Sequence, residues 1–499
     1  MLYQRFSDAA GQAPATSGLH EAGRFVSYAD VAERAGRIAT GLLARGIERG
    51  TPIGLLMING PELLTLAYGI FGAGAVVVPL NAHAPRAELA MTARKAHVGA
   101  VIASQPYADV AASLVADLAG PGALPLFIAG STDDWSVAAL ERYSTGTLPQ
   151  IGPNDHALYM FSSGSTGIPK VVPHTHAELD IDLQGAREVG RYNTSDIMIN
   201  MMPGSHAMGF LSAIHVAAAC ASTLYWSDPQ PFMLSRGRFA KAIQDNGVTV
   251  VMGVPFMFDA LAGLRDEVDL SSVRYAQSGG VALRRETYDR FKARFGIPLR
   301  QGYGSTECLS IAINDFGDPD ATWDSVGKPA PRLTLTLEPA DNPFGPEVGE
   351  IVVSSPAVTK GYLDAPEVNA RTLRDGKFYT GDLGALDSEG NVYIKGRSKL
   401  IIEVAGHKVD PFEIEEVLGT HPAVAEAVVV GIPDARTGEQ RLKAVVVRAA
   451  DETPDALIRF CRERLASQKV PAVVEFRDEI PKSATGKILR GKLMEAANA

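Results

Sequence analysis

The sequence predicts an α/β protein with a large N-terminal part of layered α/β subdomains, a β-rich subdomain and a small α+β C-terminal domain. Short apolar runs alternate with longer helical patterns from Phe25 to about Val101 and again from Leu158 to Tyr303, a rhythm typical of layers built on parallel sheets. From Ser325 to Asp387 apolar and polar residues alternate between Pro/Gly turns, which indicates strands. After Lys399 the pattern returns to mixed helices and strands.

In the N-terminal part, the segment Tyr28–Arg45 has helical periodicity, and a second segment needs a decision between core and membrane. Residues 63–85 contain no Asp, Glu, Lys or Arg, and this length would suffice for a bilayer. Glycines at 69, 72 and 74 and prolines at 79 and 85 interrupt the run. We therefore predict a buried helix through about Phe71, a glycine turn and a strand Ala75–Leu80, without a membrane span.

The C-terminal hundred residues have the size of a small domain. Their patterns predict two helices and two strands. The helices are Pro411–Gly419 and Pro454–Leu465, and the strands are Val424–Gly431 and Leu442–Arg448. We expect an N-terminal domain over residues 1–396, a junction at 397–399 and a C-terminal domain over 400–499.

Bulk properties exclude several classes of protein. A chain of 499 residues is long enough for about two to four domains. A net charge of −10 without a basic stripe argues against general nucleic-acid binding. The three cysteines are far apart and form no metal-binding spacing, and the first residues carry no secretory signal, so we expect a cytoplasmic protein without disulfides or zinc. No pattern predicts the oligomeric state.

The most informative segment is the run of hydroxyl groups and glycines that Lys170 closes. It consists of Ser162, Ser163, Gly164, Ser165, Thr166, Gly167, Ile168, Pro169 and Lys170. Glycine lets backbone N–H groups approach phosphate oxygens, hydroxyls donate further hydrogen bonds, and lysine supplies a positive charge. The apolar residues 157–161 just before it predict a buried strand. The run is neither a Walker A nor a dinucleotide-binding motif; the alternatives are a phosphate-binding loop and a polar surface turn.

Four further motifs follow in the chain. They read Gln-Gly-Tyr-Gly-Ser-Thr-Glu at 301–307, Tyr-Thr-Gly-Asp at 379–382, Gly-Arg-Ser-Lys at 396–399 and Pro-Lys-Ser-Ala-Thr-Gly-Lys at 481–487. In this order, and together with residues 162–170, they resemble the adenylate-forming superfamily of acyl- and aryl-CoA synthetases, adenylation domains and luciferases. The resemblance covers nearly the whole chain and is strongest to the acyl-CoA synthetases.

The resemblance implies an AMP-forming acid–thiol ligase. Its members activate a carboxylate at the α-phosphate of ATP, release pyrophosphate and pass the acyl group from AMP to a thiol, with Mg²⁺ bound at the phosphates. The expected substrate is an apolar aliphatic or aromatic acid, and the expected acceptor is coenzyme A. A phosphopantetheine thiol on a carrier protein is the alternative acceptor, and a nucleotide-binding relative without catalysis is a third interpretation.

The resemblance also assigns roles to individual residues. Glu307 would bind magnesium, because a hard cation prefers carboxylate oxygen; Thr306 would bind the α-phosphate, Tyr303 would stack on adenine, and Asp382 and Arg397 would hold the ribose. The other expected ATP-binding residues are those of the phosphate loop (Ser162, Ser163, Gly164, Ser165, Thr166, Gly167 and Lys170) with Gly279 and Gly280.

Roles in the two half-reactions follow in the same way. Lys487 would act between the carboxylate and the α-phosphate, Lys399 would be the hinge of a mobile C-terminal lid, and Gly406 would leave room for the pantetheine thiol. His206 would be a gate between the acid and the thiol, although a lone histidine in an apolar stretch is more often a core residue. The expected acyl pocket consists of His206, Met208, Phe210, Gly280, Gly302 and Gly304, which offer no fixed charge for a second carboxylate or an amine.

Overall fold

The computed structural model describes residues 1–21, 23–119, 124–163, 169–226, 232–314, 317–404, 407–433, 440–482 and 488–494. These residues form two compact units. The first consists of residues 1–334 and 353–378, and the second of residues 335–352 and 379–499.

The first unit contains a six-stranded sheet in the order β6-β5-β3-β4-β7-β8. All neighbouring pairs are parallel except β7 and β8, which form an antiparallel pair at one edge. The strands are β3 (Pro52–Leu56), β4 (Val76–Pro79), β5 (Ala100–Ser104), β6 (Leu126–Ala129), β7 (His156–Ser163) and β8 (Pro169–Thr175).

A nine-stranded sheet in the order β15-β14-β13-β12-β11-β9-β10-β1-β2 follows in the same unit. Its centre is parallel, and antiparallel pairs close both ends. The strands are β1 (Gly18–Glu21), β2 (Arg24–Ser27), β9 (Ile197–Asn200), β10 (Thr223–Trp226), β11 (Val250–Gly253), β12 (Tyr275–Gly279), β13 (Leu299–Ser305), β14 (Leu309–Ile313) and β15 (Lys328–Pro329).

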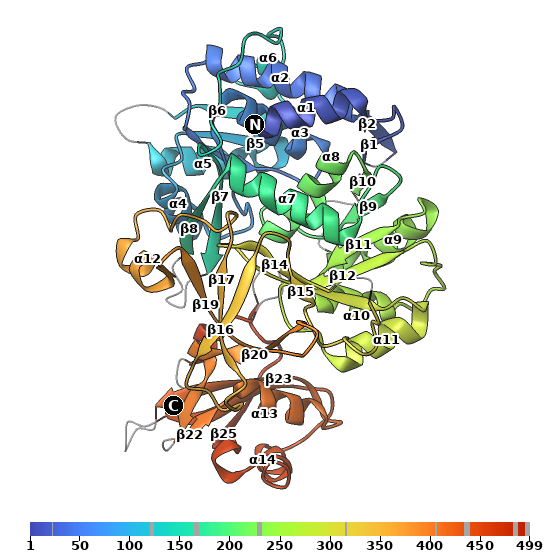
Figure 1. Ribbon diagram of the computed structural model, residues 1–499, viewed down its shortest axis with the longest axis vertical. Coiled ribbons are helices and arrows are strands. Elements are labelled where there is room, and N and C mark those ends of the chain that lie inside the picture. Colours follow the sequence, from blue (N-terminus) through green and yellow to red (C-terminus); the bar gives the residue numbers. More distant parts are fainter. Residues whose placement is uncertain are drawn as a thin grey trace. The chain divides into compact units, whose positions relative to one another are not determined.

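Helices cover both faces of these sheets, as Figure 1 shows. Alternate residues of one strand enter different cores: Ile53 and Leu55 of β3 lie in one apolar cluster, and Leu56 lies in another. The first cluster also contains residues of β9, β11 and β12, so one helical layer lies between the two sheets. That layer comprises α1 (Leu2–Gln12), α2 (Tyr28–Ala44), α3 (Pro61–Ala73), α7 (His176–Gly190) and α8 (Val216–Cys220).

The remaining helices of the first unit cover the outer faces or lie in connections. Helices α4 (Arg86–Lys95) and α5 (Ala108–Leu118) pack together on the six-stranded sheet, and α9 (Phe232–Asp245), α10 (Pro255–Ala262) and α11 (Arg285–Phe295) pack on the nine-stranded one. Short helices are α6 (Val137–Leu140), α12 (Pro366–Thr372) and the 3₁₀ turn η1 (Gln105–Tyr107). The segment η2 (Met208–His215) is a π-helix.

The β-rich segment forms a five-stranded sheet with the order β16-β17-β19-β18, in which β20 also pairs with β19. Its strands are β16 (Thr334–Pro339), β17 (Gly349–Ser354), β18 (Leu373–Arg374), β19 (Lys377–Leu386) and β20 (Val392–Arg397). The prediction of strands in this region is thereby confirmed.

The C-terminal residues form a three-stranded sheet and a hairpin around their own core. The strands are β21 (Ile402–Val404), β22 (His407–Val409), β23 (Val424–Pro433), β24 (Gln440–Arg448) and β25 (Val473–Phe476); the helices are α13 (Pro411–Gly419), α14 (Pro454–Arg462) and α15 (Gly491–Met494), with the 3₁₀ turns η3 (Ser398–Leu400) and η4 (Ser467–Lys469). The two helices and two strands predicted here are all present.

The uncharged run from residue 63 is the buried helix α3, followed by Gly74 at φ +72° and by β4, as predicted. The left-handed conformation of Gly74 explains why a glycine ends the helix. Among the described residues, no helix has both the length and the apolar character needed to cross a membrane.

Candidate active site

The predicted phosphate loop connects β7 to β8. Because β7 is parallel to β4, its carboxyl end lies at the edge of the sheet where the other parallel strands also end, the edge at which α/β sheets bind ligands. Ser162 and Lys170 are paired across the two strands at the base of the loop. Gly164, Ser165, Thr166 and Gly167 lie outside the described residues, as does the side chain of Ser163.

The second motif occupies the end of β13 and the turn into β14. Tyr303 and Thr306 are partly buried there, and Glu307 is 8% exposed. The carbonyl oxygen of Thr306 lies 2.7 Å from Nε2 of His174 on β8, which therefore carries the proton and donates it. This hydrogen bond ties the turn to the strand that follows the phosphate loop.

The carboxylate of Glu307 has one partner among the described residues. The Tyr362 hydroxyl donates to its Oε1 over 2.8 Å, and no described residue donates to Oε2. Burial raises the pKa of Tyr362 above its ordinary value, which keeps the hydroxyl protonated as a donor. One carboxylate oxygen is thus held in place while the other is available to a ligand.

Tyr362 also reaches the phosphate loop. The ammonium group of Lys170 lies 5.1 Å from the centre of the Tyr362 ring, within the distance of a cation–π contact. Lys170 and Glu307 are 137 positions apart in the chain, and Tyr362 contacts both. The five motifs did not include this tyrosine.

Four of the predicted glycine and pocket residues lie together at the carboxyl ends of β12 and β13. A Cβ on Gly279 would come within 2.6 Å of Met208 Cε and 3.1 Å of the Gly302 oxygen, and one on Gly280 would lie 3.9 Å from the same Met208 atom. Gly280 has φ +82°, a conformation that favours glycine. The structure thus brings Met208, Gly279, Gly280 and Gly302 to one place.

The space beside Gly302 and Gly304 is filled. A Cβ on Gly302 would lie 2.3 Å from Nε2 of Gln277, and a Cβ on Gly304 would lie 2.4 Å from the Leu309 oxygen. Gln277 belongs to β12 and was not among the predicted residues. A glutamine amide therefore stands where the glycine at 302 suggested open space.

His206 lies in the loop that leads from β9 into η2. Its Nδ1 accepts a hydrogen bond from the Met208 N–H (3.3 Å), so in the neutral ring the proton is on Nε2. The Asn59 side chain holds the preceding backbone with two hydrogen bonds: its Nδ2 donates to the Met202 carbonyl oxygen (2.9 Å), and its Oδ1 accepts from the Gly204 N–H (2.7 Å). Phe210, predicted in the acyl pocket, is 2% exposed and belongs to the apolar cluster between the two sheets.

Asp382 and Arg397 lie in the second unit as paired residues of β19 and β20. Nε of Arg397 donates to Oδ1 of Asp382, whose residue is 4% exposed. The Asp382 N–H donates to Thr380 Oγ1 (3.0 Å), and Gly381 has φ +74°. The motif residues therefore hold one carboxylate and one guanidinium group together on neighbouring strands.

Three residues with predicted roles in the two half-reactions lie wholly or partly outside the described residues. The backbone of Lys399 belongs to η3, but the structure does not describe its side chain. Gly406 and Lys487 are not among the described residues. Cys308, next to Glu307, is 1% exposed. Burial raises the pKa of its thiol well above the ordinary value, in agreement with a packing role.

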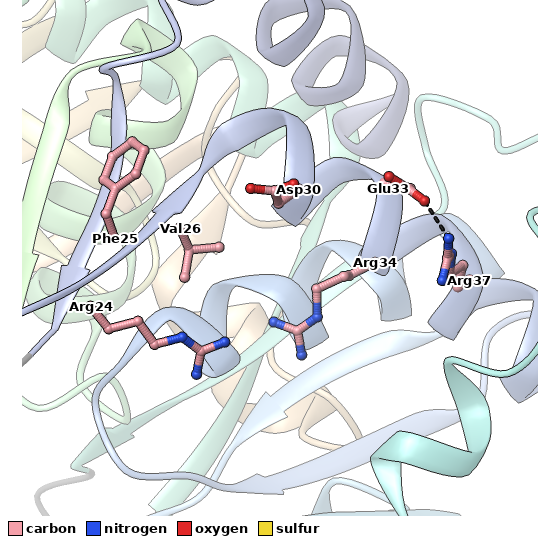
Figure 2. A pocket seen from close by; sticks show the side chains of 7 residues that line it. All are labelled: Arg24, Phe25, Val26, Asp30, Glu33, Arg34 and Arg37. Atoms are coloured by element: carbon pink, nitrogen blue, oxygen red, sulfur yellow. Dashed lines mark hydrogen bonds and ion pairs between the residues drawn. The ribbon is translucent and has the colours of Figure 1, made fainter.

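Two pockets near the N-terminus contain none of the predicted site residues. One, of about 320 Å³, is lined by residues of β2 and α2, and Figure 2 shows Arg24, Arg34 and Arg37 among them. Arg34 is bound to Glu62 and Glu141, and Arg37 to Glu33. The second, of about 420 Å³, shares Arg24 and Arg34.

Comparison with known proteins identifies the family. The family model described as "AMP-binding enzyme" matches residues 4–363, and "AMP-binding enzyme C-terminal domain" matches residues 413–487. The chain belongs to the AMP-binding enzyme family. The sequence-based prediction of an adenylate-forming ligase of the acyl-CoA synthetase type, with its α/β fold and small C-terminal domain, is thereby confirmed.

Individual relatives of this AMP-binding enzyme are similar over nearly their whole length. A feruloyl-CoA synthase from Amycolatopsis is 33% identical, with 97% of this chain and 96% of that protein covered. The ATP-bound crystal structure of MatB from Rhodopseudomonas palustris superposes with a TM-score of 0.88 at 28% identity, covering 99% and 98%. An anthranilate CoA ligase, AuaEII, in complex with anthranoyl-AMP has a TM-score of 0.87 at 27% identity, covering 99% and 97%.

Proposed function

We propose that this enzyme converts an apolar aromatic or aliphatic carboxylic acid to its CoA thioester through an acyl-adenylate. The observation that carries the proposal is the convergence of Lys170 and Glu307 on Tyr362. It places a cation of the phosphate loop near a carboxylate that keeps one oxygen available. Charges of both signs at one place suit a triphosphate and its metal ion.

In the first half-reaction, a carboxylate oxygen of the acid attacks the α-phosphorus of ATP. A new P–O bond forms, the bond to the bridging oxygen breaks, and pyrophosphate leaves with the electron pair. Lys170, Thr306 and the hydroxyls of the phosphate loop would bind the negatively charged oxygens, and Lys487 would bridge the acid and the α-phosphate. Their contribution is to orient the two reactants and to stabilise the charge that develops.

Magnesium would be held at Glu307 through the oxygen that Tyr362 does not engage. Within the described part of the chain, no three His, Cys, Asp or Glu residues converge on one point. A single carboxylate fits Mg²⁺ bound to a nucleotide, which takes its other ligands from phosphates and water. The bound ion would neutralise phosphate charge.

The nucleoside would be bound by residues of several of the motifs. Tyr303 would stack on adenine, Gly279 and Gly280 would let it approach the backbone, and Asp382 would accept hydrogen bonds from the ribose hydroxyls. Arg397 donates to that carboxylate, so it would fix the carboxylate oxygens for this purpose.

In the second half-reaction, the sulfur of a thiol attacks the acyl carbon. The C–S bond forms, the C–O bond to AMP breaks, AMP leaves, and the thiol proton passes to solvent. His206 and Gly406 would border the path of the thiol, and the lid beyond Lys399 would change its position between the two half-reactions. The domain boundary at 397–399 belongs to the same proposal.

The proposed substrate class rests on the pocket and on the relatives. Met208 and the neighbouring glycines offer apolar walls, and Gln277 adds a neutral amide. The feruloyl-CoA synthase and the anthranilate CoA ligase are named for aromatic acids. An aromatic acid that carries a hydrogen-bonding substituent would suit such a site, because the partly buried amide would gain a partner.

The test is pyrophosphate release from ATP and Mg²⁺ across aromatic, aliphatic, amino and dicarboxylic acids, each with and without CoA. We expect turnover with an aromatic or apolar acid that rises sharply when CoA is added. Exchange of pyrophosphate into ATP with an acid, but no response to CoA, would point to a carrier protein as the acceptor. Silence with every acid would contradict the proposal.

A further inference from the structure

We propose that Tyr362 is a positioning residue for metal-bound ATP. Its hydroxyl holds Oε1 of the Glu307 carboxylate and leaves Oε2, which would hold the ion, and its ring contacts the Lys170 ammonium group. The inference rests on the proposed role of Glu307 as the magnesium ligand. It assigns a function to a residue that lies outside the motifs.

The hydroxyl contact is buried on both sides. Tyr362 is 7% exposed and Glu307 is 8% exposed, and their oxygens are 2.8 Å apart. A hydrogen bond from a neutral donor to an ionised carboxylate is strong in such surroundings. Because Oε1 is engaged, the carboxylate cannot rotate freely, and Oε2 keeps one direction.

The backbone around Tyr362 is fixed from two sides. The Asn369 side chain accepts a hydrogen bond from the Tyr362 backbone N–H (2.8 Å) and donates one to the Tyr362 backbone carbonyl oxygen (2.9 Å). The Leu363 N–H donates to the Val171 oxygen on β8 (3.0 Å). The backbone that carries the tyrosine is therefore fixed by contacts other than the one with Glu307.

Residues 359–363 also contact the backbone of the turn that contains Glu307. The Thr359 N–H donates to the backbone carbonyl oxygen of Glu307 (2.9 Å), and the Thr359 hydroxyl donates to the carbonyl oxygen of Pro173 on β8 (2.6 Å). Thus residues 359–363 join β8 to the turn at Glu307 through main-chain and side-chain hydrogen bonds. These hydrogen bonds hold Lys170 on β8 and the Glu307 carboxylate at a fixed separation.

The ring supplies the second contact. An ammonium group above an aromatic face is attracted by the electron-rich face of the ring, which has a quadrupole moment, and Lys170 Nζ lies 5.1 Å from the ring centre. Tyr362→Phe keeps this contact and removes only the hydroxyl, whereas Tyr362→Leu removes both. The two variants therefore separate the role toward Glu307 from the role toward Lys170.

The experiment measures equilibrium binding of ATP by calorimetry, once with Mg²⁺ and once with EDTA, for the full-length enzyme. Mutation of a residue that orients a metal ligand typically weakens metal binding by roughly ten- to a hundredfold. We expect Tyr362→Phe to lower ATP affinity about tenfold with Mg²⁺ and to leave the affinity in EDTA unchanged. Tyr362→Leu should weaken binding under both conditions, because Lys170 loses its ring.

Tyr28→Phe is the matched control, since the Tyr28 hydroxyl is fully buried in the same unit and donates to the Ser222 oxygen (2.7 Å). It should leave the gain from Mg²⁺ unchanged. An equal loss with Mg²⁺ and EDTA, or no loss, in Tyr362→Phe would overturn the inference. Glu307→Gln tests the foundation: if it retains the full gain from Mg²⁺, the metal assignment itself is wrong, and the inference falls with it.

Discussion

At the scale of single residues, Gln277 determines the shape of the proposed acyl pocket beside Gly302. Its Nε2 occupies the position that a Cβ on Gly302 would need, at a separation of 2.3 Å. Gln277 belongs to β12, which pairs with β13 so that Gly279 lies opposite Gly302. The glycine thus accommodates a polar side chain, which the pattern of glycines alone did not indicate.

We expect Gly302→Ala to push the Gln277 amide toward the acid. The contact is with the end of a flexible side chain, so the free energy of unfolding should change by less than about 1 kcal/mol. The KM for the acid should rise, by roughly tenfold if one hydrogen bond is lost, and the KM for ATP should stay constant. Steady-state kinetics with each substrate varied in turn measures both constants.

Gly237→Ala is the control for this substitution. It lies in α9, and a Cβ there would meet nothing within 4 Å. Alanine in a helix interior is favoured over glycine by roughly 1 kcal/mol, so this variant should be slightly more stable with unchanged kinetics. A rise in KM for both substrates in Gly302→Ala would contradict the placement of Gln277 at the acid.

At the scale of elements, the loop from β9 to the π-helix η2 depends on Asn59, which follows β3. One amide holds the Met202 oxygen and the Gly204 N–H, two positions before His206. Because the amide makes both hydrogen bonds at once, it fixes the loop in one register. The helix that follows carries Met208, so the same clamp determines where the pocket wall begins.

Asn59→Ala should therefore slow thioester formation more than adenylation. The loss of two hydrogen bonds corresponds to about 1–3 kcal/mol, or roughly a tenfold to hundredfold effect on the affected step. Single-turnover measurements of acyl-adenylate formation and of its reaction with CoA separate the two steps. Equal slowing of both steps would show that the loop does not act through His206.

The elements and the motifs could be predicted because their signals are local. Tyr28–Ala44, the strand before the phosphate loop and the C-terminal helices follow from apolar periodicity and from capping residues within a few positions. The hydrogen bonds of Asn59 to the loop before η2 and of Tyr362 to Glu307 could not be predicted from the sequence, because each joins residues 55 or more positions apart. The only local signal near Tyr362 was Gly361, whose φ of +148° requires glycine.

At the scale of the whole molecule, the helical layer between the two large sheets contains histidines that must remain neutral. His176 is 1% exposed and His215 is 2% exposed, and the Tyr68 hydroxyl lies 2.9 Å from Nδ1 of His215. Neither ring nitrogen of His176 has a hydrogen-bond partner among the described residues. Burial lowers the pKa of His176 to about 4 and that of His215 to about 3.

These pKa values predict how stability depends on pH. In the unfolded chain both histidines take up protons below about pH 6.5, whereas in the folded chain they stay neutral until about pH 4. The free energy of unfolding should therefore be unaffected by these groups above pH 6.5 and should fall as the pH drops below it. From pH 7 to pH 5 each histidine should remove about 2 kcal/mol.

His176→Leu tests this prediction, because leucine keeps an apolar side chain at a position where the ring makes no hydrogen bond among the described residues. Urea unfolding at pH 5 and at pH 7 should show a loss of stability on acidification that is smaller in the variant by about 2 kcal/mol. At pH 7 the variant should be as stable as the parent or more so, since a buried polar group without a partner has been removed. If parent and variant lost the same free energy between the two pH values, His176 would have to be protonated in the folded state, and the central layer would tolerate a buried charge.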